Sequence, residues 1–394
     1  MRVRQFVLFT ALMATRAAAH SISNEAAVGF TQDTPANPHG TNYSDQLITR
    51  FDLNDDWSLK LGGSYTHETS VAPAPGAFFP TSTAEIGSLL LGADWDVSPR
   101  VNLSIDASIS PRSTQTLDAV VQYSIERPPT PTNPTPPPIV LPSDVLLHNA
   151  TAAYGAQLGV SVVVGGDEFL GVPLGGTLLD ASVGWMLFDT EQKVQKVYSA
   201  QMERAFSLDA LRAGCKQAST TQQRTACRRL AAALNGGEDT LNQVSLSLSV
   251  LQPIGETTYV GLTAGYYLYD KDPDFAGVFA TRVSSNLGTS LGVGLPLAPP
   301  LFVLRPQLEQ RLGRWTVGLW YQFTEYASDN GYAHSLGTRI AFRIDANWQV
   351  WVSGSAQWDH LAELVSAPDT LSAGAGSFTS ITSGTVALGF RAKF

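Results

Sequence analysis

The chain has 394 residues, of which 44% are hydrophobic, with a mean hydropathy of zero and a formal net charge of −9. An acidic chain that lacks a basic stripe with interleaved aromatic residues is not expected to bind nucleic acid. The length would ordinarily indicate two or three domains, although one all-β barrel can use a chain of this size. The balanced hydropathy fits a soluble protein, and it also fits strands in which apolar and polar residues alternate.

The N-terminus has the features of a secretory signal peptide. Arg2 and Arg4 precede a short apolar stretch over 6–14, and Ala17-Ala18-Ala19 offers a cleavage site. The apolar stretch is shorter than the about 20 residues that a membrane-spanning helix needs. We therefore expect 1–19 to be removed on export. This also removes Arg16, so that 22 basic residues remain against 34 acidic ones and the mature net charge is −12.

Alternation of apolar and polar residues then predicts strand after strand. The segment 101–109, for example, places Leu103 and Ile105 on one face and Ser104 and Asp106 on the other. Fourteen strands are predicted, with twelve or sixteen as alternatives, and an even number is typical of bacterial transmembrane barrels. They cover 24–31, 46–54, 57–65, 86–96, 101–109, 150–164, 177–188, 244–250, 258–269, 301–312, 314–323, 336–344, 348–358 and 383–394.

The segment 111–149 is expected to project beyond the membrane. Alternation continues over 115–125 and 146–153, which predicts a hairpin longer than the bilayer requires. Its tip, 128–138, is rich in proline, which cannot continue a strand ladder and favours a stiff polyproline II conformation. We interpret this tip as a spacer.

Residues 190–238 break the alternating pattern. The stretch 191–206 is rich in helix formers, and Ser219–Gln222 resembles a capping box. Both cysteines, Cys215 and Cys227, lie here. One continuous helix would separate them by about 18 Å, whereas a turn near Ser219 would let them meet. Because an exported protein meets an oxidising compartment, we predict a helical extracellular insert held by a Cys215–Cys227 disulfide, and no metal site.

The last twelve residues, Ser383–Phe394, form the most informative strand. Val386, Leu388 and Phe390 share one face, and Arg391 and Lys393 share the other. The segment resembles the C-terminal sorting strand of Gram-negative outer-membrane β-barrel proteins, which typically ends in Phe. The resemblance implies a single antiparallel transmembrane β-barrel over 20–394 in the cell outer membrane, porin-like or transporter-like, without pointing to one family. It also implies that Phe390 and Phe394 are an assembly signal for the barrel-assembly machinery.

The connections support a barrel. Short ones near 54–56, 97–100, 253–256, 313 and 345–347 are predicted at the periplasmic end, with a longer turn over 165–176. Long ones over 32–44, 67–83, 111–149, 189–242, 270–300, 324–333 and 359–378 are predicted outside the cell. Tryptophans would then form girdles at the two membrane interfaces, with Trp57, Trp95, Trp315 and Trp348 at one and Trp185 and Trp358 at the other.

The lumen carries the functional argument, because alternation assigns many charged side chains to it. A basic wall facing a more acidic wall resembles the transverse field of a porin constriction, and charged rings select ions and small solutes. Alternatively, the charges pair across the lumen and plug it. The residues predicted to line the pore are Lys60, Asp106, Asp180, Arg305, Glu309, Arg311, Arg314, Arg339, Arg343 and Arg391.

We therefore predict a channel or transporter for small solutes that needs no cofactor and is not an enzyme. The expected partners are outer-membrane lipids, lipopolysaccharide and small solutes, and the protein is a monomer or a trimer. A fatty-acid-type hydrophobic transporter is a variant, but such proteins have an N-terminal hatch, for which 20–45 is short.

Two alternatives remain. One is a structural or surface-interaction barrel with a plugged lumen. The other is an outer-membrane barrel hydrolase, which would use Asp359 and His360 at the outer rim or the G-x-S-x-G match at Gly288–Gly292.

Overall fold

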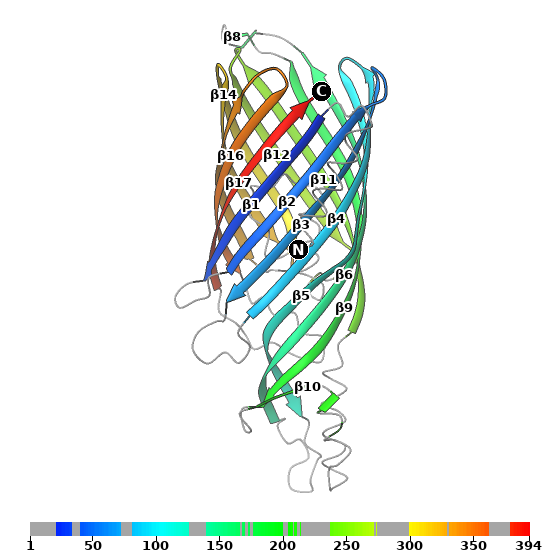
Figure 1. Cartoon of the computed structure of the whole chain (residues 1–394), viewed down its shortest axis with the longest axis vertical. Helices are drawn as coiled ribbons and strands as arrows, with labels where there is room; N and C mark the ends of the chain where they lie inside the picture. Colours follow the sequence, from blue (N-terminus) through cyan, green and yellow to red (C-terminus); the bar gives the residue numbers. More distant parts are fainter. Residues whose placement is uncertain are drawn as a thin grey trace.

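The computed structural model is a closed antiparallel barrel (Figure 1). It describes residues 21–33, 40–71, 81–125, 139–165, 168–169, 172–173, 176–199, 204–207, 209–210, 213, 237–271, 273, 299–328, 331–361 and 379–394. Within these ranges no helix is long and apolar enough to cross a membrane.

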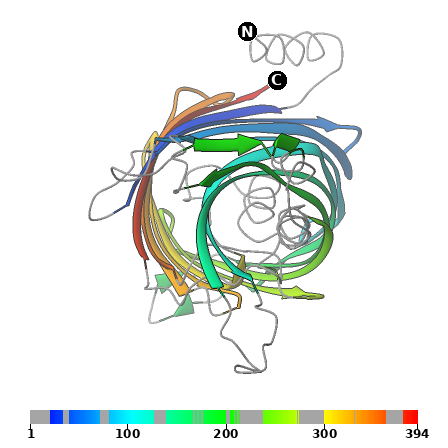
Figure 2. The same cartoon turned by 90° about the horizontal axis from the view of Figure 1, so that it is seen from below.

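Fourteen strands make the wall, as the alternation predicts. The first strand pairs with the last, and β6 pairs with β9, so the ladder closes on itself (Figure 2). The strands are β1 Ser21–Asp33, β2 Gly40–Asp52, β3 Trp57–Val71, β4 Thr81–Ser98, β5 Val101–Ile125, β6 Ile139–Val164, β9 Thr177–Ser199, β11 Gly237–Ile254, β12 Thr258–Tyr269, β13 Pro300–Leu312, β14 Trp315–Tyr326, β15 Gly331–Arg343, β16 Trp348–Leu361 and β17 Thr379–Lys393.

The outer surface of the wall is apolar, because period-two alternation sends every second side chain outward. Val28 and Leu388 are 61% and 65% exposed, an arrangement that is unfavourable in water and expected against lipid. Trp57 and Trp95 stack on one rim with ring centroids 5.4 Å apart, and Trp348 contacts Phe390 at 6.2 Å on the same rim. These contacts fit the predicted aromatic girdle.

The short connections gather at one end of the barrel, which we call the turn end, and the opposite end is the loop end. Two tight turns are closed by side chains. The Asn54 Oδ1 accepts hydrogen bonds from the backbone N–H groups of Asp56 and Trp57, and the Asp345 Oδ1 does the same for Asn347 and Trp348. The turn predicted over 165–176 contains a small hairpin of two strands with two residues each, β7 Glu168–Phe169 and β8 Val172–Pro173.

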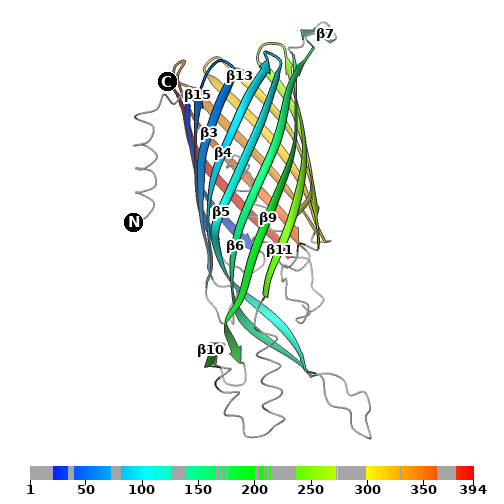
Figure 3. The same cartoon turned by 90° about the vertical axis from the view of Figure 1, so that its right-hand side faces the viewer.

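At the loop end, β5, β6 and β9 run well past the other strands, as Figure 3 shows. After a register shift between Ser110 and Ser113, residues 113–125 pair continuously with 139–151, which confirms the predicted hairpin beyond the barrel. We call this extension the arm. The proline-rich tip, 128–138, lies outside the described residues.

The predicted helix over 191–206 is wrong for most of its length. Residues 191–199 continue β9, and Arg204–Ser207 form a short strand, β10, that pairs with it. Pairing with β6 over 191–197 and with β10 over 196–199 supplies backbone hydrogen bonds that outweigh the local helix propensity of 191–199. Cys215 and Cys227 lie outside the described residues, so the helical insert, its disulfide and the signal peptide stay predictions.

Candidate functional site

Strand register places nine of the ten predicted pore-lining residues on the inward face of the wall. Arg305, Glu309 and Arg311 alternate inward along β13, and Arg339 and Arg343 do so along β15. The other four, on four different strands, are Lys60, Asp106, Asp180 and Arg391. Whether they line a conducting path stays a prediction.

Arg314 differs from the prediction. It lies exposed in the turn before β14, not on a strand, and its Nη1 donates a hydrogen bond of 3.3 Å to the carbonyl oxygen of Ile344. Gly313, with φ of 64°, turns the chain at this point, so the inward alternation of β13 does not continue into Arg314. The arginine joins two neighbouring turns.

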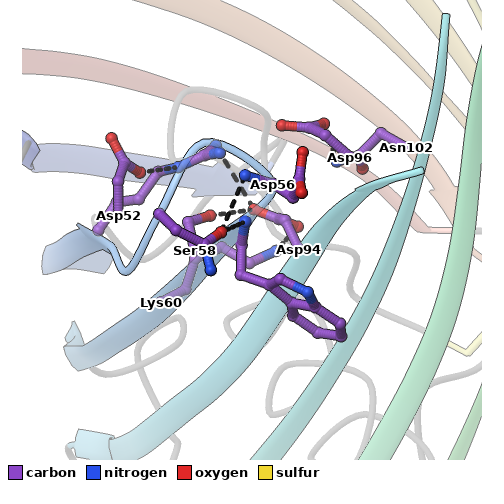
Figure 4. Close-up of polar contacts among 10 residues, drawn as sticks. Asp52, Asp56, Ser58, Lys60, Asp94, Asp96 and Asn102 are labelled. Carbon is purple, nitrogen blue, oxygen red and sulfur yellow. Dashed lines mark hydrogen bonds and ion pairs between the residues drawn. The ribbon is translucent and has the colours of Figure 1, made fainter. Parts of the chain in front are cut away.

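One inward cluster is an ion-pair network on β2 to β5, which we call the paired wall (Figure 4). The Lys60 ammonium lies 3.0 Å from an Asp94 carboxylate oxygen and 2.8 Å from an Asp106 carboxylate oxygen. Arg50 reaches Asp52 at 3.1 Å and Asp94 at 3.4 Å. Two cations are therefore matched with three carboxylates on adjacent or next-adjacent strands.

A glycine makes this network possible. Lys60 on β3 and Asp106 on β5 both lie opposite Gly92 on the strand between them. A Cβ on Gly92 would come within 2.0 Å of an Asp106 carboxylate oxygen. The missing side chain lets the carboxylate cross β4 and reach the ammonium.

A second inward cluster, on β13 to β16, holds its arginines differently, and we call it the stacked wall. The Arg305 guanidinium lies over the Trp320 ring, 5.0 Å from its centroid, and Arg339 lies over Trp351 at 4.2 Å. Both tryptophan side chains are buried. The Trp351 Nε1 donates a hydrogen bond of 2.5 Å to a carboxylate oxygen of Glu25 on β1.

Glycines also leave the space that these tryptophan rings occupy. Trp320 lies across Gly337 on the next strand, and Trp351 lies across Gly389. A Cβ on either glycine would come within 2.2 or 2.3 Å of the ring. Each ring is therefore pressed flat against the wall, which leaves its other face for the guanidinium.

No acid of the described residues lies within ion-pair distance of the arginines of the stacked wall, although the charges of Glu25 and Glu309 act on Arg339 from further away. Within the described residues, neither Arg305 nor Arg339 makes a hydrogen bond or an ion pair, and the Nε of each is buried without an acceptor. The Trp320 Nε1 and the Ser353 hydroxyl are likewise buried without a partner. Glu25 Oε1 is a buried acceptor without a partner in the same cluster, so among the described residues the unpaired donors here outnumber the unpaired acceptors.

Nearer the turn end, charge and aromatic contacts are mixed. Arg311 lies 4.3 Å from the ring centroid of Tyr259, and its Nε is 3.6 Å from a Glu309 carboxylate oxygen. Both Arg311 and Glu309 are substantially exposed, so their mutual attraction is screened by water.

Nearer the loop end, the inward face is partly apolar, a feature that the alternating pattern does not predict. Ile86, Phe188 and Leu241 are buried together with Ala153, and Tyr269 packs against them. Tyr269 donates a hydrogen bond of 2.8 Å to the carbonyl of Pro300. The sequence contains a weak signal of this cluster, because each of these apolar residues occupies a position where the alternation calls for a polar one. Each strand contributes only one such residue.

The structure does not bring together a catalytic pair at the outer rim. Asp359 points inward, where it accepts hydrogen bonds from the Tyr326 hydroxyl at 2.6 Å and from the Gln357 amide. His360, the next residue on β16, points outward and contacts the Tyr332 ring. Residues 288–292 lie outside the described residues, and no group of three metal-ligating side chains occurs in the part that is described.

The C-terminal strand closes the barrel against β1, and Phe390 faces outward beside Trp348. Phe394 is 71% exposed. Their role as an assembly signal stays a prediction.

No protein-family model and no curated protein sequence matches this chain. Solved structures do. A FadL homologue of Pseudomonas aeruginosa matches with a TM-score of 0.56 at 10% identity, over 95% of this chain and 90% of that one. The toluene transporter TbuX of Ralstonia pickettii matches with 0.52 at 10% identity, over 98% and 93%. The monoaromatic hydrocarbon channel CymD matches with 0.51 at 9% identity, over 98% and 92%. The likeness shows the fold: this chain is a closed β-barrel like theirs.

Proposed function

We propose that this barrel is a channel that passes small solutes across the outer membrane. The observation that carries the proposal is the direction of the ion pairs in the lumen. In the described strands, each pair joins residues on the same, adjacent or next-adjacent strands, as with Lys60 and Asp106, so these pairs run along the wall and not across the lumen. This favours a lumen that is open over one plugged by its own charges.

The size of the barrel supports the same function. Fourteen strands about 4.8 Å apart and tilted by about 40° enclose a backbone cylinder about 28 Å across. Side chains of moderate length on both walls leave room for water and small solutes in a cylinder of this width. Eight-stranded barrels, in contrast, are filled by their side chains.

Apolar solutes are a narrower candidate within this function. The cluster of Ile86, Phe188, Leu241 and Tyr269 places buried apolar side chains on the inward face near the loop end. The matched structures include a toluene transporter and a monoaromatic hydrocarbon channel. Residues 21–33 and 40–45 are wall strands, which agrees with the expectation that 20–45 is too short for an N-terminal hatch.

Planar-bilayer recordings on the purified full-length protein test the proposal, with heat-unfolded protein from the same preparation as the control. We expect discrete conductance steps from the folded protein alone, and faster entry of small solutes into proteoliposomes than into protein-free liposomes. Folded, heat-modifiable protein that gives neither conductance nor solute entry would show that the lumen is closed.

The arm supports one second candidate, a surface-interaction barrel. It extends the β5–β6–β9 ladder beyond the rest of the wall, where it is accessible from outside the cell. A protein that never conducts, but whose binding to lipopolysaccharide is lost when residues 117–147 are replaced by a short glycine-serine turn, would favour this function. Lipopolysaccharide contact and the choice between monomer and trimer stay proposals.

A further inference from the structure

Two arginines and two tryptophans form a continuous band on the stacked wall, made of Arg305, Trp320, Arg339 and Trp351 on β13, β14, β15 and β16. We propose that this band is a binding site for small organic carboxylates with an apolar body, such as an aromatic ring. The proposal rests on the proposed channel function and names a substrate class for it.

The band is continuous because the strand register twice places a tryptophan opposite a glycine of the next strand. Trp320 pairs with Gly337, two residues before Arg339 on the same strand, and Trp351 pairs with Gly389, which in turn pairs with Glu25. Each glycine seats a ring, and each ring carries a guanidinium on its lumenal side. Two guanidiniums are thereby held on neighbouring parts of one wall, facing the same lumen.

The charge of the band is unbalanced. Glu25 accepts a hydrogen bond from Trp351 and not from an arginine, and the charges of Glu25 and Glu309 act on Arg339 from beyond ion-pair distance. Neither guanidinium makes an ion pair within the described ranges, although the paired wall shows that this barrel can supply carboxylates to its cations. An arginine that keeps its charge in a half-buried place without a protein acceptor is suited to an acceptor that arrives from solution.

The chemistry of the band selects a carboxylate. A guanidinium presents a planar fork of N–H donors that matches the two oxygens of a carboxylate. Its flat face also stacks on aromatic rings, as it does here on Trp320 and Trp351. An aromatic carboxylate can use both properties, whereas chloride can use neither.

The apolar cluster lies nearer the loop end than the band. Arg305 pairs with Thr263 on β12, and Tyr269 lies six residues further along the same strand toward the loop end, about 20 Å away. Because Ile86, Phe188 and Leu241 are buried, it is the band itself that would contact the apolar body of the solute.

Calorimetric titration of the full-length protein in detergent micelles tests the proposal, with benzoate and its neutral isostere benzamide as the probes. The variants are R305Q, R339Q and the double variant. R100Q is the matched control, because it makes the same change at an exposed turn outside the lumen. Migration on a gel with and without heating confirms that each variant is folded. The charge-preserving R305K/R339K variant provides a second comparison.

We expect the wild type and R100Q to bind benzoate at least tenfold more tightly than benzamide. Each arginine removed should weaken benzoate binding by about tenfold and leave benzamide binding unchanged. R305K/R339K should keep a preference for benzoate, with reduced strength, because lysine keeps the charge and loses the fork. Equal affinity for benzoate and benzamide in the wild type would overturn the proposal, and so would a double variant that still prefers benzoate.

The same proteins distinguish this inference from the channel function. If the wild type conducts ions but shows no benzoate preference, the channel stands and the site is rejected. If the wild type binds benzoate through these arginines but never conducts, the site stands in a barrel that is not a channel.

Discussion

The paired wall and the stacked wall solve the same problem in opposite ways. Both must hold cations inside a membrane-spanning barrel, where an isolated charge is costly. The paired wall neutralises Lys60 with carboxylates within 3.0 Å, whereas the stacked wall places Arg339 on an aromatic ring at 4.2 Å. The first arrangement satisfies its charges internally, and the second leaves them available to a solute. The comparison therefore separates charges that stabilise the wall from charges that can act on what passes through it.

Removing one cation from each wall should give the largest difference between them. Lys60→Met leaves Asp94 and Asp106 facing each other in a half-buried site without their shared partner, which should cost about 3 kcal/mol of unfolding free energy. Arg305→Met removes only a stacking contact worth about 1 kcal/mol. Urea unfolding in lipid vesicles, followed by tryptophan fluorescence, measures both.

Adding Asp106→Asn to Lys60→Met should recover part of the loss, because Asp106 is the carboxylate that loses its cation, whereas Asp94 keeps Arg50. If Lys60→Met and Arg305→Met cost the same, the two walls do not differ in the way that their contacts indicate.

Substitution of the two glycines that lie against the tryptophan rings should give the next largest loss of stability. Gly337→Ala and Gly389→Ala place a Cβ within 2.2 to 2.3 Å of a tryptophan ring, so the ring and its arginine must move, at a cost of about 2 kcal/mol. Gly318→Ala is the matched control, because it also faces inward on this wall and its nearest neighbours lie 3.9 to 4.0 Å away. The heat-modifiable folded fraction and urea unfolding report the difference. Loss of stability in Gly318→Ala alone would contradict the seating role.

The difference between the walls could not be read from the sequence, although the inward position of most of their charges could. Alternation within one strand is enough to assign Lys60, Asp106, Arg305 and Arg339 to the lumen. Which charges meet depends on the register between strands, and Lys60 and Asp106 are joined across a strand that contributes only Gly92 between them. A two-residue slip would keep every side chain on its own face and still abolish that contact, and alternation within a strand does not distinguish these two registers.

The missed features have the same origin. The helix predicted over 191–206 rests on local propensity, which pairing with β6 and β10 overrides over 191–199. The apolar cluster near the loop end uses single residues such as Phe188 and Leu241 from separate strands, and only the closed barrel gathers them. Arg314 was misplaced by one position at a strand boundary, where a turn ends the alternation.

Ion selectivity should shift less, and it should shift through the stacked wall. At about 7 Å in water, one unit charge changes the energy of a passing ion by about 0.6 kcal/mol, or nearly threefold in local concentration. Replacing Arg305 and Arg339 together by Gln should therefore move the reversal potential in a KCl gradient toward cation preference. The shift should shrink in about 1 M salt, where the Debye length is about 3 Å.

The paired wall provides the comparison for this measurement. The double change Lys60→Met and Asp106→Asn removes one charge of each sign, so its effect on selectivity should be smaller than that of the arginine pair. A larger effect from the change in the paired wall would contradict this prediction, because it would show that the paired wall, and not the stacked wall, determines ion selectivity.

The arm offers a third environment for a basic side chain and the smallest expected effect. His148 lies in β6 on the part of the ladder beyond the barrel, opposite Lys193 on β9. Burial, together with the nearby charges of Arg112 and Lys193, lowers the pKa of His148 below its usual value, although Glu191 opposes the shift. The burial of the imidazole and the charges of the two cations therefore outweigh the one acidic neighbour, so the neutral form is favoured more than in a free histidine.

This environment predicts a pH dependence that is confined to the arm. As the pH falls below about 6.5, an unfolded arm takes up a proton on this histidine before the folded arm does, so the folded arm loses stability between that pH and the lowered pKa. Hydrogen exchange of residues 146–152 and 189–194, corrected for intrinsic rates, should show less protection at pH 5.5 than at pH 7.5, while β13 to β16 should show no such change. His148→Gln should remove the pH dependence of the arm. If the arm is equally protected at both pH values in the wild type, the proton on His148 is not coupled to its folding.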